Sequence, residues 1–165
     1  MKKVIMLFMM LISLVSMEAQ SIKGFELGKE YNGYPIESTT IADLPFVING
    51  YTLDDGRIWQ IIAISGERFD KHTGNYKPLA MYSTDIDILK DVFNRHFGID
   101  MVKTTASDYS GSFTYEYYDT NTFYMIMAES LDMDGVKYKV SIIITDKKLS
   151  QVYENQVRNQ AGQDI

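Results

Sequence analysis

Histidine is the side chain that most often combines metal binding with proton transfer, and this 165-residue chain has His72 and His96. A structural zinc site takes four nitrogen or sulfur ligands, and the chain has no cysteine to complete such a set. His96 is followed by Phe97 and Gly98, which is typical of a helix C-terminus where a histidine interacts with free carbonyls. The sequence therefore predicts no metal site.

Two acidic segments resemble the start of a calcium-binding loop. Residues 130–135 read Ser-Leu-Asp-Met-Asp-Gly, but the position that requires a bidentate glutamate is Ser141. Residues 54–56 read Asp-Asp-Gly. The sequence on either side of both segments is strand-like, so we interpret both as hairpin turns.

Nucleophilic serine catalysis requires a serine, a base and an acid that orients the base. No Gly-x-Ser-x-Gly elbow is present, because the Ile-Ser-Gly segment at residues 64–66 lacks the preceding glycine. The early glycines are spaced wrongly for a phosphate-binding loop, and nothing selects two carboxylates as a glycosidase pair. No catalytic residue and no cofactor is assigned. A small periplasmic hydrolase with a carboxylate or Ser–His site, and His72 as its base, stays as an alternative.

Aromatic side chains are the other group that can recognise a ligand. The chain has 12 tyrosines, several of them around one predicted hairpin. A tyrosine ring with its polar tip suits sugar stacking and protein interfaces. If residues 113, 115 and 117 pack into the core, Glu116 and Tyr118 face the other side of the strand. Cross-strand pairing that only stabilises the sheet is the other interpretation. The predicted ligand-binding residues are Tyr109, Glu116, Tyr118 and Tyr124, the last as a candidate to join Tyr118.

The N-terminal segment has the composition of an export signal. Lys2 and Lys3 precede residues 4–15, which are almost wholly apolar, and Ala19 is a small residue at the exit. Spanning a bilayer takes about 20 apolar residues, and this run is shorter. The absence of cysteine excludes the lipid-modified type of signal. We predict a signal peptide at residues 1–19, cleaved near Ala19, and a periplasmic or secreted protein without a membrane anchor.

Charge and cysteine content restrict the class of partner. The formal net charge is −6 at pH 7, and it becomes −7 once the signal peptide removes two lysines and one glutamate. An acidic surface without a basic cluster disfavours nucleic acid and anionic membranes as partners. Without disulfides, stability must come from packing alone.

Turn signals and alternation predict a hairpin in the first half of the chain. Residues 46–53 and 57–65 are strand-like and are joined by the Asp-Asp-Gly turn. The second arm is apolar on both faces except at Gln60, which predicts a central strand covered on both sides. Residues 24–28 are expected to form a short edge strand, and the polar residues 66–82 a long loop.

The second half of the sequence predicts a helix and a meander. Residues 83–97 place apolar side chains on one side and charged ones on the other, and Gly98 follows as a stop. Residues 113–144 alternate as three strands, of which the middle one is expected to be internal to the sheet. Asp146 is a candidate cap for a short C-terminal helix, and the chain from Arg158 is expected to be a frayed tail.

These elements predict an α+β fold. An antiparallel sheet, made of the hairpin and the three-stranded meander, carries one main amphipathic helix and a short C-terminal helix. The expected organisation is a signal peptide at residues 1–19, a single domain at 20–157 and a flexible tail at 158–165.

Three segments carry a resemblance to known proteins. The signal ending in Ala19 and Gln20, residues 22–28 and residues 53–58 resemble small exported proteins of unknown function from Bacteroidetes. The resemblance implies a β-lactamase-inhibitor-like or related fold, with a helix on an antiparallel sheet, that serves as a binding or assembly module.

The sequence thus favours an exported, non-enzymatic module that binds a protein or a glycan in the cell envelope. A self-associating structural protein, held by the two-faced apolar strands or by an edge at residues 24–28, is a further alternative to the hydrolase.

Overall fold

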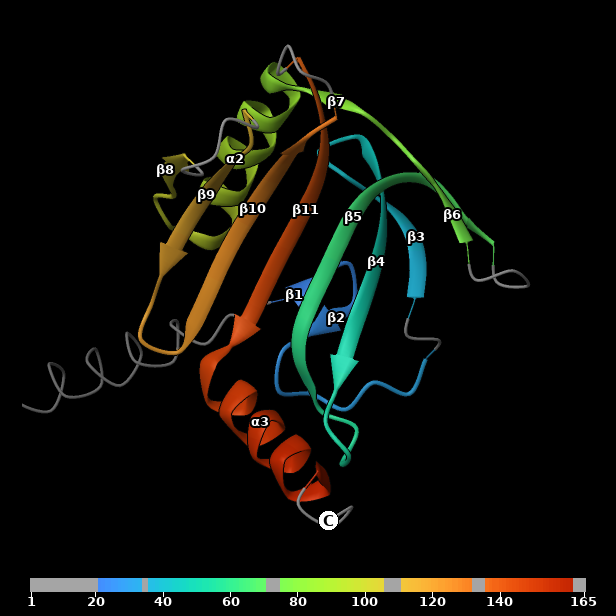
Figure 1. Ribbon diagram of the computed structural model, residues 1–165, viewed down its shortest axis with the longest axis vertical. Coiled ribbons are helices and arrows are strands. Elements are labelled where there is room, and N and C mark those ends of the chain that lie inside the picture. The colour runs from blue at the N-terminus through green and yellow to red at the C-terminus, as the bar shows by residue number, and fades with distance from the viewer. Residues whose placement is uncertain (1–20, 34–35, 71–74, 106–110, 132–135, 162–165) are drawn as a thin grey trace, which may run out of the picture.

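The fold of the chain is α+β, as the sequence predicts. The computed structural model describes residues 21–33, 36–70, 75–105, 111–131 and 136–161 (Figure 1). Within these residues, antiparallel strands form the body of the molecule and helices lie on the sheet. The predicted signal peptide lies outside the described residues.

The helices are α2 (Ser83–Phe97) and α3 (Lys147–Ala161). The strands are β1 (Ser21–Ile22), β2 (Phe25–Glu26), β3 (Ile36–Ile41), β4 (Leu44–Thr52), β5 (Ile58–Asp70), β6 (Asn75–Pro78), β7 (Met81–Tyr82), β8 (Val102–Thr105), β9 (Phe113–Tyr118), β10 (Thr122–Ser130) and β11 (Lys137–Asp146).

The main sheet has the order β3-β4-β5-β11-β10-β9-β8, and each neighbouring pair is antiparallel. The predicted hairpin is β4–β5, and the predicted meander is β9–β10–β11. β5 and β10 are internal to the sheet, which confirms the expectation from their apolar sequences.

The sheet divides after the middle of β5, and this corrects the predicted loop at residues 66–82. β5 continues to Asp70 and pairs with β6, while β7 pairs with the start of β11. Ser65 holds the branch point: its buried hydroxyl donates to the carbonyl of Leu79 (2.8 Å) and accepts from the amide of Val140 (3.1 Å). The polar composition suggested a loop, but the backbone finds partners on two neighbouring strands.

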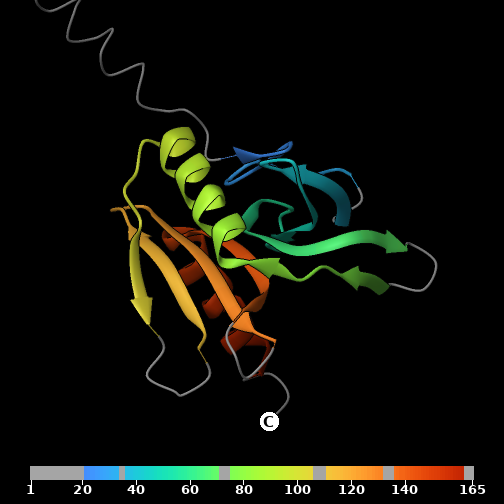
Figure 2. The same ribbon diagram turned by 90° about the horizontal axis from the view of Figure 1, so that it is seen from above.

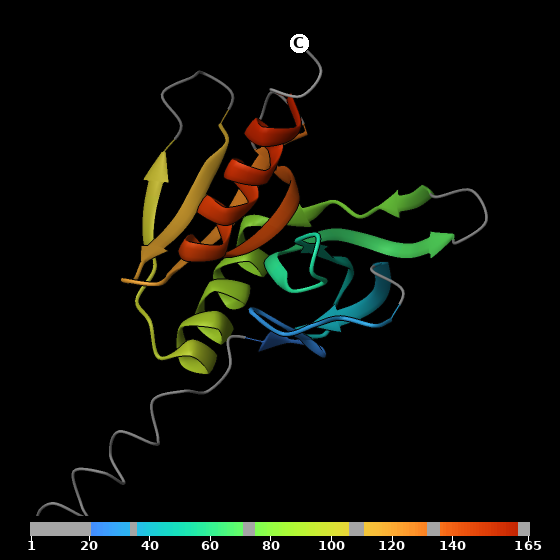
Figure 3. The same cartoon turned by 90° about the horizontal axis from the view of Figure 1, so that it is seen from below.

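The sheet has two faces that differ in how they are covered. The inner face carries α2 and the β1–β2 ribbon, and α3 lies on the opposite, outer face (Figures 2 and 3). Ile86, Leu89 and Phe93 of α2 are buried against the inner face. The buried side chains of the central strands on this face are Ile61, Ala63, Tyr124, Ile126, Ala128, Val140, Ile142 and Ile144.

The helix ends follow from local sequence. The amide of Tyr82, the N-cap of α2, donates to the Asp85 carboxylate (3.0 Å), and Gly98 ends the helix with a φ of 64°. Asp146 caps α3 by accepting from the amide of Leu149 (3.0 Å). α3 continues to Ala161, so the tail expected from residue 158 begins as helix.

The N-terminal ribbon β1–β2 is not the expected edge strand. β2 pairs with β1 alone, and Phe25 is fully buried on the inner face of β4. Its ring stacks on Tyr31 at 4.6 Å and lies against Gly50, where a Cβ would come within 2.7 Å of the ring. The ribbon is therefore part of the core, because Gly50 leaves room for an aromatic ring.

Candidate functional site

Two of the residues predicted to bind a ligand, Glu116 and Tyr118, lie on β9. Tyr118 is 63% exposed on the outer face, and its ring lies 4.6 Å from that of Phe123 on β10. Its hydroxyl donates to the carboxylate of Glu116 (3.1 Å), which also accepts from the hydroxyl of Thr114 (2.8 Å). Glu116 and Tyr118 therefore lie together on one surface, as the alternation predicts.

The placement of Tyr124 corrects the prediction that it joins Tyr118. Tyr124 pairs with Tyr117 across β9 and β10, so both lie on the inner face. Tyr124 is 3% exposed and its ring lies 5.1 Å from Phe97 of α2. Burial, with a smaller effect of the Asp119 charge, raises the pKa of Tyr124 to about 12. Tyr109 lies outside the described residues.

Tyr115 links the inner face to α2. Its hydroxyl donates to the carboxylate of Asp87 at 2.6 Å. Burial raises the pKa of Tyr115 to about 12, and the bond to Asp87 adds to the effect. This tyrosine positions the helix on the sheet, so its role is structural.

An apolar strip runs across the outer face of the three central strands. We call it the outer strip. Each of its side chains is partly exposed, in contrast to the buried side chains behind it on the same strands. α3 lies over one end of this face, where it contacts β5 and β11 (Figure 3). The outer strip consists of Ile62 and Ile64 on β5, Ile143 on β11, and Phe123, Met125 and Met127 on β10.

A second group of aromatic rings lies beside α3. The ring of Trp59 stacks on Tyr153 of α3 (4.5 Å) and lies 6.4 Å from that of Tyr51. A β-bulge places Trp59 there: Tyr51 pairs with Gln60 and Thr52 with Ile58, so Trp59 is the extra residue. The buried Trp59 Nε1 has no hydrogen-bond partner among the described atoms. Tyr51 and Tyr153 are 42% and 39% exposed, so the group borders solvent.

Lysines border the outer strip at both ends. Lys137 and Lys139 begin β11, and Lys147 and Lys148 begin α3. Lys139 forms an ion pair with Glu129 at 3.3 Å. Carboxylates lie among these lysines: Glu116 and Glu129 on the sheet, Asp146 directly before Lys147, and Asp119, whose backbone carbonyl accepts from the Lys147 ammonium.

Among the described residues, no group of three histidine, cysteine or acidic side chains could hold a metal ion. His96 lies near the end of α2 with its ring edge-on to Phe97 at 4.6 Å, while His72 lies outside the described residues. None of the described helices is both long and apolar enough to cross a bilayer.

Comparison of the chain with protein-family models, with curated proteins and with solved structures gave no match. The resemblance to exported Bacteroidetes proteins therefore stays a prediction.

The sequence indicated the outer strip only indirectly. The apolar residues on both faces of β5 and β10 predict strands internal to the sheet, and for β5 a cover on both sides, so they do not predict an open outer surface. No sequence pattern predicts that Trp59 faces outward, because the bulge that turns it depends on the pairing of β4 with β5.

Proposed function

We propose that this chain is an exported, non-enzymatic module that binds a partner protein through the outer strip. The observation that carries the proposal is that apolar side chains on the outer face of β5, β10 and β11 are only partly covered, while those on the inner face are buried. An uncovered apolar patch on a folded domain usually marks an interaction site. Here the patch lies in the middle of the sheet.

The residue types of the surface favour a protein over a glycan. Met, Tyr, Trp and Phe are enriched in protein interfaces, and tryptophan and tyrosine often dominate the binding energy. The outer strip has two methionines at its centre, and the rings of Tyr118 and Trp59 lie toward its sides. A glycan site needs ring faces open to solvent with polar groups around them. One face of Trp59 is already covered by Tyr153.

The border of the strip mixes both charges, since Lys139 pairs with Glu129 and Lys147 follows Asp146. Support for a partner protein on this face therefore comes from the apolar side chains and not from net charge.

A binding experiment with matched variants tests the proposal. Met127→Glu places a charge on the outer strip, and Ile88→Glu places the same charge on the solvent side of α2, where Ile88 is 56% exposed. We expect the chain and Ile88→Glu to retain the same protein from an envelope extract, and Met127→Glu to lose it.

Three outcomes would contradict the proposal. Equal retention by Met127→Glu and the unchanged chain would exclude the outer strip as the binding surface. Retention of polysaccharide without protein would favour the glycan alternative. A dimer in light scattering that Met127→Glu converts to a monomer would favour self-association.

A further inference from the structure

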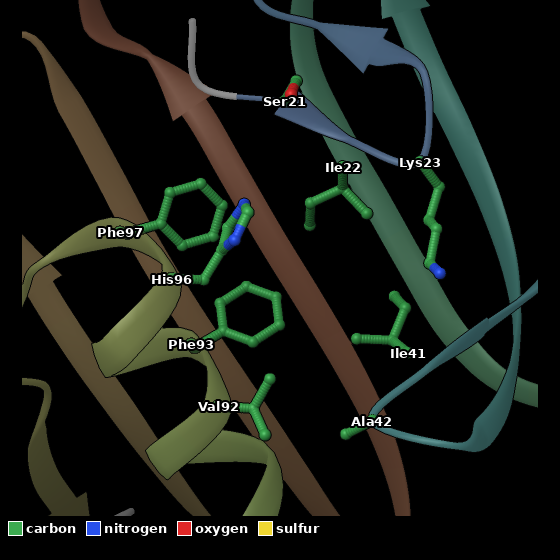
Figure 4. A pocket seen from close by; sticks show the side chains of 9 residues that line it. All are labelled: Ser21, Ile22, Lys23, Ile41, Ala42, Val92, Phe93, His96 and Phe97. Atoms are coloured by element: carbon green, nitrogen blue, oxygen red, sulfur yellow. The ribbon is translucent and has the colours of Figure 1, made fainter. Parts of the chain in front are cut away.

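A second candidate site lies on the inner side of the sheet, away from the outer strip. A cavity of about 370 Å³ opens between the C-terminal half of α2 and two hairpin turns (Figure 4). Ligand pockets in proteins typically have volumes of about 300–1,000 Å³. One wall is formed by α2, and the other by the β1–β2 turn and the β3–β4 turn. The lining residues are Ser21, Ile22, Lys23, Ile41, Ala42, Val92, Phe93, His96 and Phe97.

The cavity combines an apolar floor with polar groups on opposite walls. Ile22, Ile41 and Phe93 are nearly buried and belong to the hydrophobic core. His96 projects from the helix wall and Lys23 from the hairpin wall, with apolar side chains between them (Figure 4). No carboxylate lines the cavity.

Lys23 lacks a counter-charge in the described part of the chain, where no ion pair or hydrogen bond includes its ammonium. An ammonium beside an apolar cavity is stabilised by an anion and destabilised by a purely apolar occupant. The lining therefore matches a ligand with an apolar body and an anionic head.

The backbone of both turns is that of tight hairpins. Three described non-glycine residues have positive φ: Lys23 at 50°, Ala42 at 52° and Asp43 at 62°. The pairs at 23–24 and 42–43 are two-residue hairpin loops, which favour positive φ at both positions. A glycine in place of Lys23 would suit this turn, yet it would remove the positive charge from the cavity wall.

We propose that this cavity binds one small aliphatic carboxylate, with the chain against Ile22, Ile41 and Phe93 and the carboxylate at Lys23. This site is separate from the outer strip, so each can be occupied without the other.

Titration calorimetry on the full purified chain tests the site, with decanoate as the ligand and decanol as its uncharged counterpart. Lys23→Gly removes the ammonium and suits the φ of the turn, so the variant is expected to fold at least as stably. It should weaken decanoate binding about tenfold, since a charge-assisted hydrogen bond is lost, and leave decanol binding nearly unchanged. Lys29→Gln is the matched control, because Lys29 is an exposed lysine on the same segment that does not line the cavity.

Val92→Phe tests the location. Val92 lines the cavity from the helix wall, and a larger ring there fills the space, so both ligands should fail to bind while the chain stays folded. Vesicles of phosphatidylglycerol distinguish a lipid head group from a free acid as the source of the anion.

The proposal is overturned if decanoate does not bind at millimolar concentration, if Lys23→Gly binds it as tightly as the unchanged chain, or if Val92→Phe leaves binding intact. Binding to the vesicles without binding of free decanoate would also overturn it.

Discussion

The two faces of the same three strands differ more than their sequences do. β5 and β10 carry apolar side chains on both faces, and β11 carries Ile143 on its outer face. The inner face is covered by α2 and the β1–β2 ribbon, yet the outer strip is partly open. Ile142 and Ile143 show the contrast within two residues: Ile142 is 1% exposed, and Ile143 remains partly exposed. Burial of an apolar residue stabilises the fold, whereas an exposed one adds little to the free energy of unfolding.

This contrast distinguishes the buried apolar side chains of the inner face, which stabilise the fold, from the partly exposed ones of the outer strip, which stabilise it less. An antiparallel sheet with one open face usually alternates apolar inside and polar outside. β11 begins with this pattern, since Lys137 and Lys139 face outward, and then departs from it at Ile143. Folding alone does not explain why apolar side chains occupy outward positions in the outer strip.

The largest expected effect comes from the neighbouring isoleucines of β11. Ile142→Ala should lower the free energy of unfolding by about 2–5 kcal/mol, because it leaves a cavity in the closed core. Ile143→Ala should lower it by less than about 1 kcal/mol, since solvent already reaches that side chain. Urea unfolding of the two variants measures both values.

Equal losses for the two variants would show that the outer strip is as closed as the core and would remove the basis of the proposed interface. If the outer strip is the interface, Ile143→Ala should weaken partner binding although it hardly changes the free energy of unfolding.

The sequence predicts most of the fold but only part of the site. The hairpin, the helix α2 and the meander follow from periodicity, because their apolar residues recur at strand or helix spacing. β3 has no such pattern: the Ile-Glu-Ser-Thr-Thr-Ile run of Ile36–Ile41 becomes a strand only through pairing with β4. The strand is therefore determined by its neighbour in the sheet and not by the strand propensity of its own residues.

The site depends on register, which local sequence does not determine. Glu116 and Tyr118 are two residues apart on one strand, so alternation alone places them together. Tyr124 lies on another strand, and its face depends on how the turn at residues 119–121 sets the pairing with Tyr117. The cavity at Lys23 could not be predicted from the sequence, because its walls come from a helix and two turns that are distant in the sequence.

A medium effect is expected at Gly50, whose missing side chain lets the β1–β2 ribbon join the inner face. Gly50→Ala should destabilise the fold by about 1–3 kcal/mol, because its Cβ would lie 2.7 Å from the ring of Phe25. Asn49→Ala, one residue earlier and partly exposed on the outer face, is the matched control. Thermal unfolding should separate the two, and a Gly50→Ala protein as stable as Asn49→Ala would mean that the ribbon packs elsewhere.

The smallest effect at neutral pH is expected from the hydroxyl of Tyr124, and it grows only in alkali. The pKa of Tyr124 is raised to about 12 by burial, whereas an unfolded tyrosine has a pKa of about 10. Between these values the unfolded chain loses a proton that the folded chain keeps, so ionisation favours unfolding. The contribution of Tyr124 is therefore fully present below about pH 10 and is lost as the pH rises through about 12.

Tyr124→Phe should remove this titration, so its stability declines less steeply between pH 10 and 12 than that of the unchanged chain. Tyr118→Phe, on the exposed face, should change the slope less. Urea unfolding across this pH range measures both slopes, together with the ultraviolet absorbance of tyrosinate. If Tyr118→Phe flattened the curve more than Tyr124→Phe, the outer tyrosine would be the more buried one and the assignment of the two faces would be reversed.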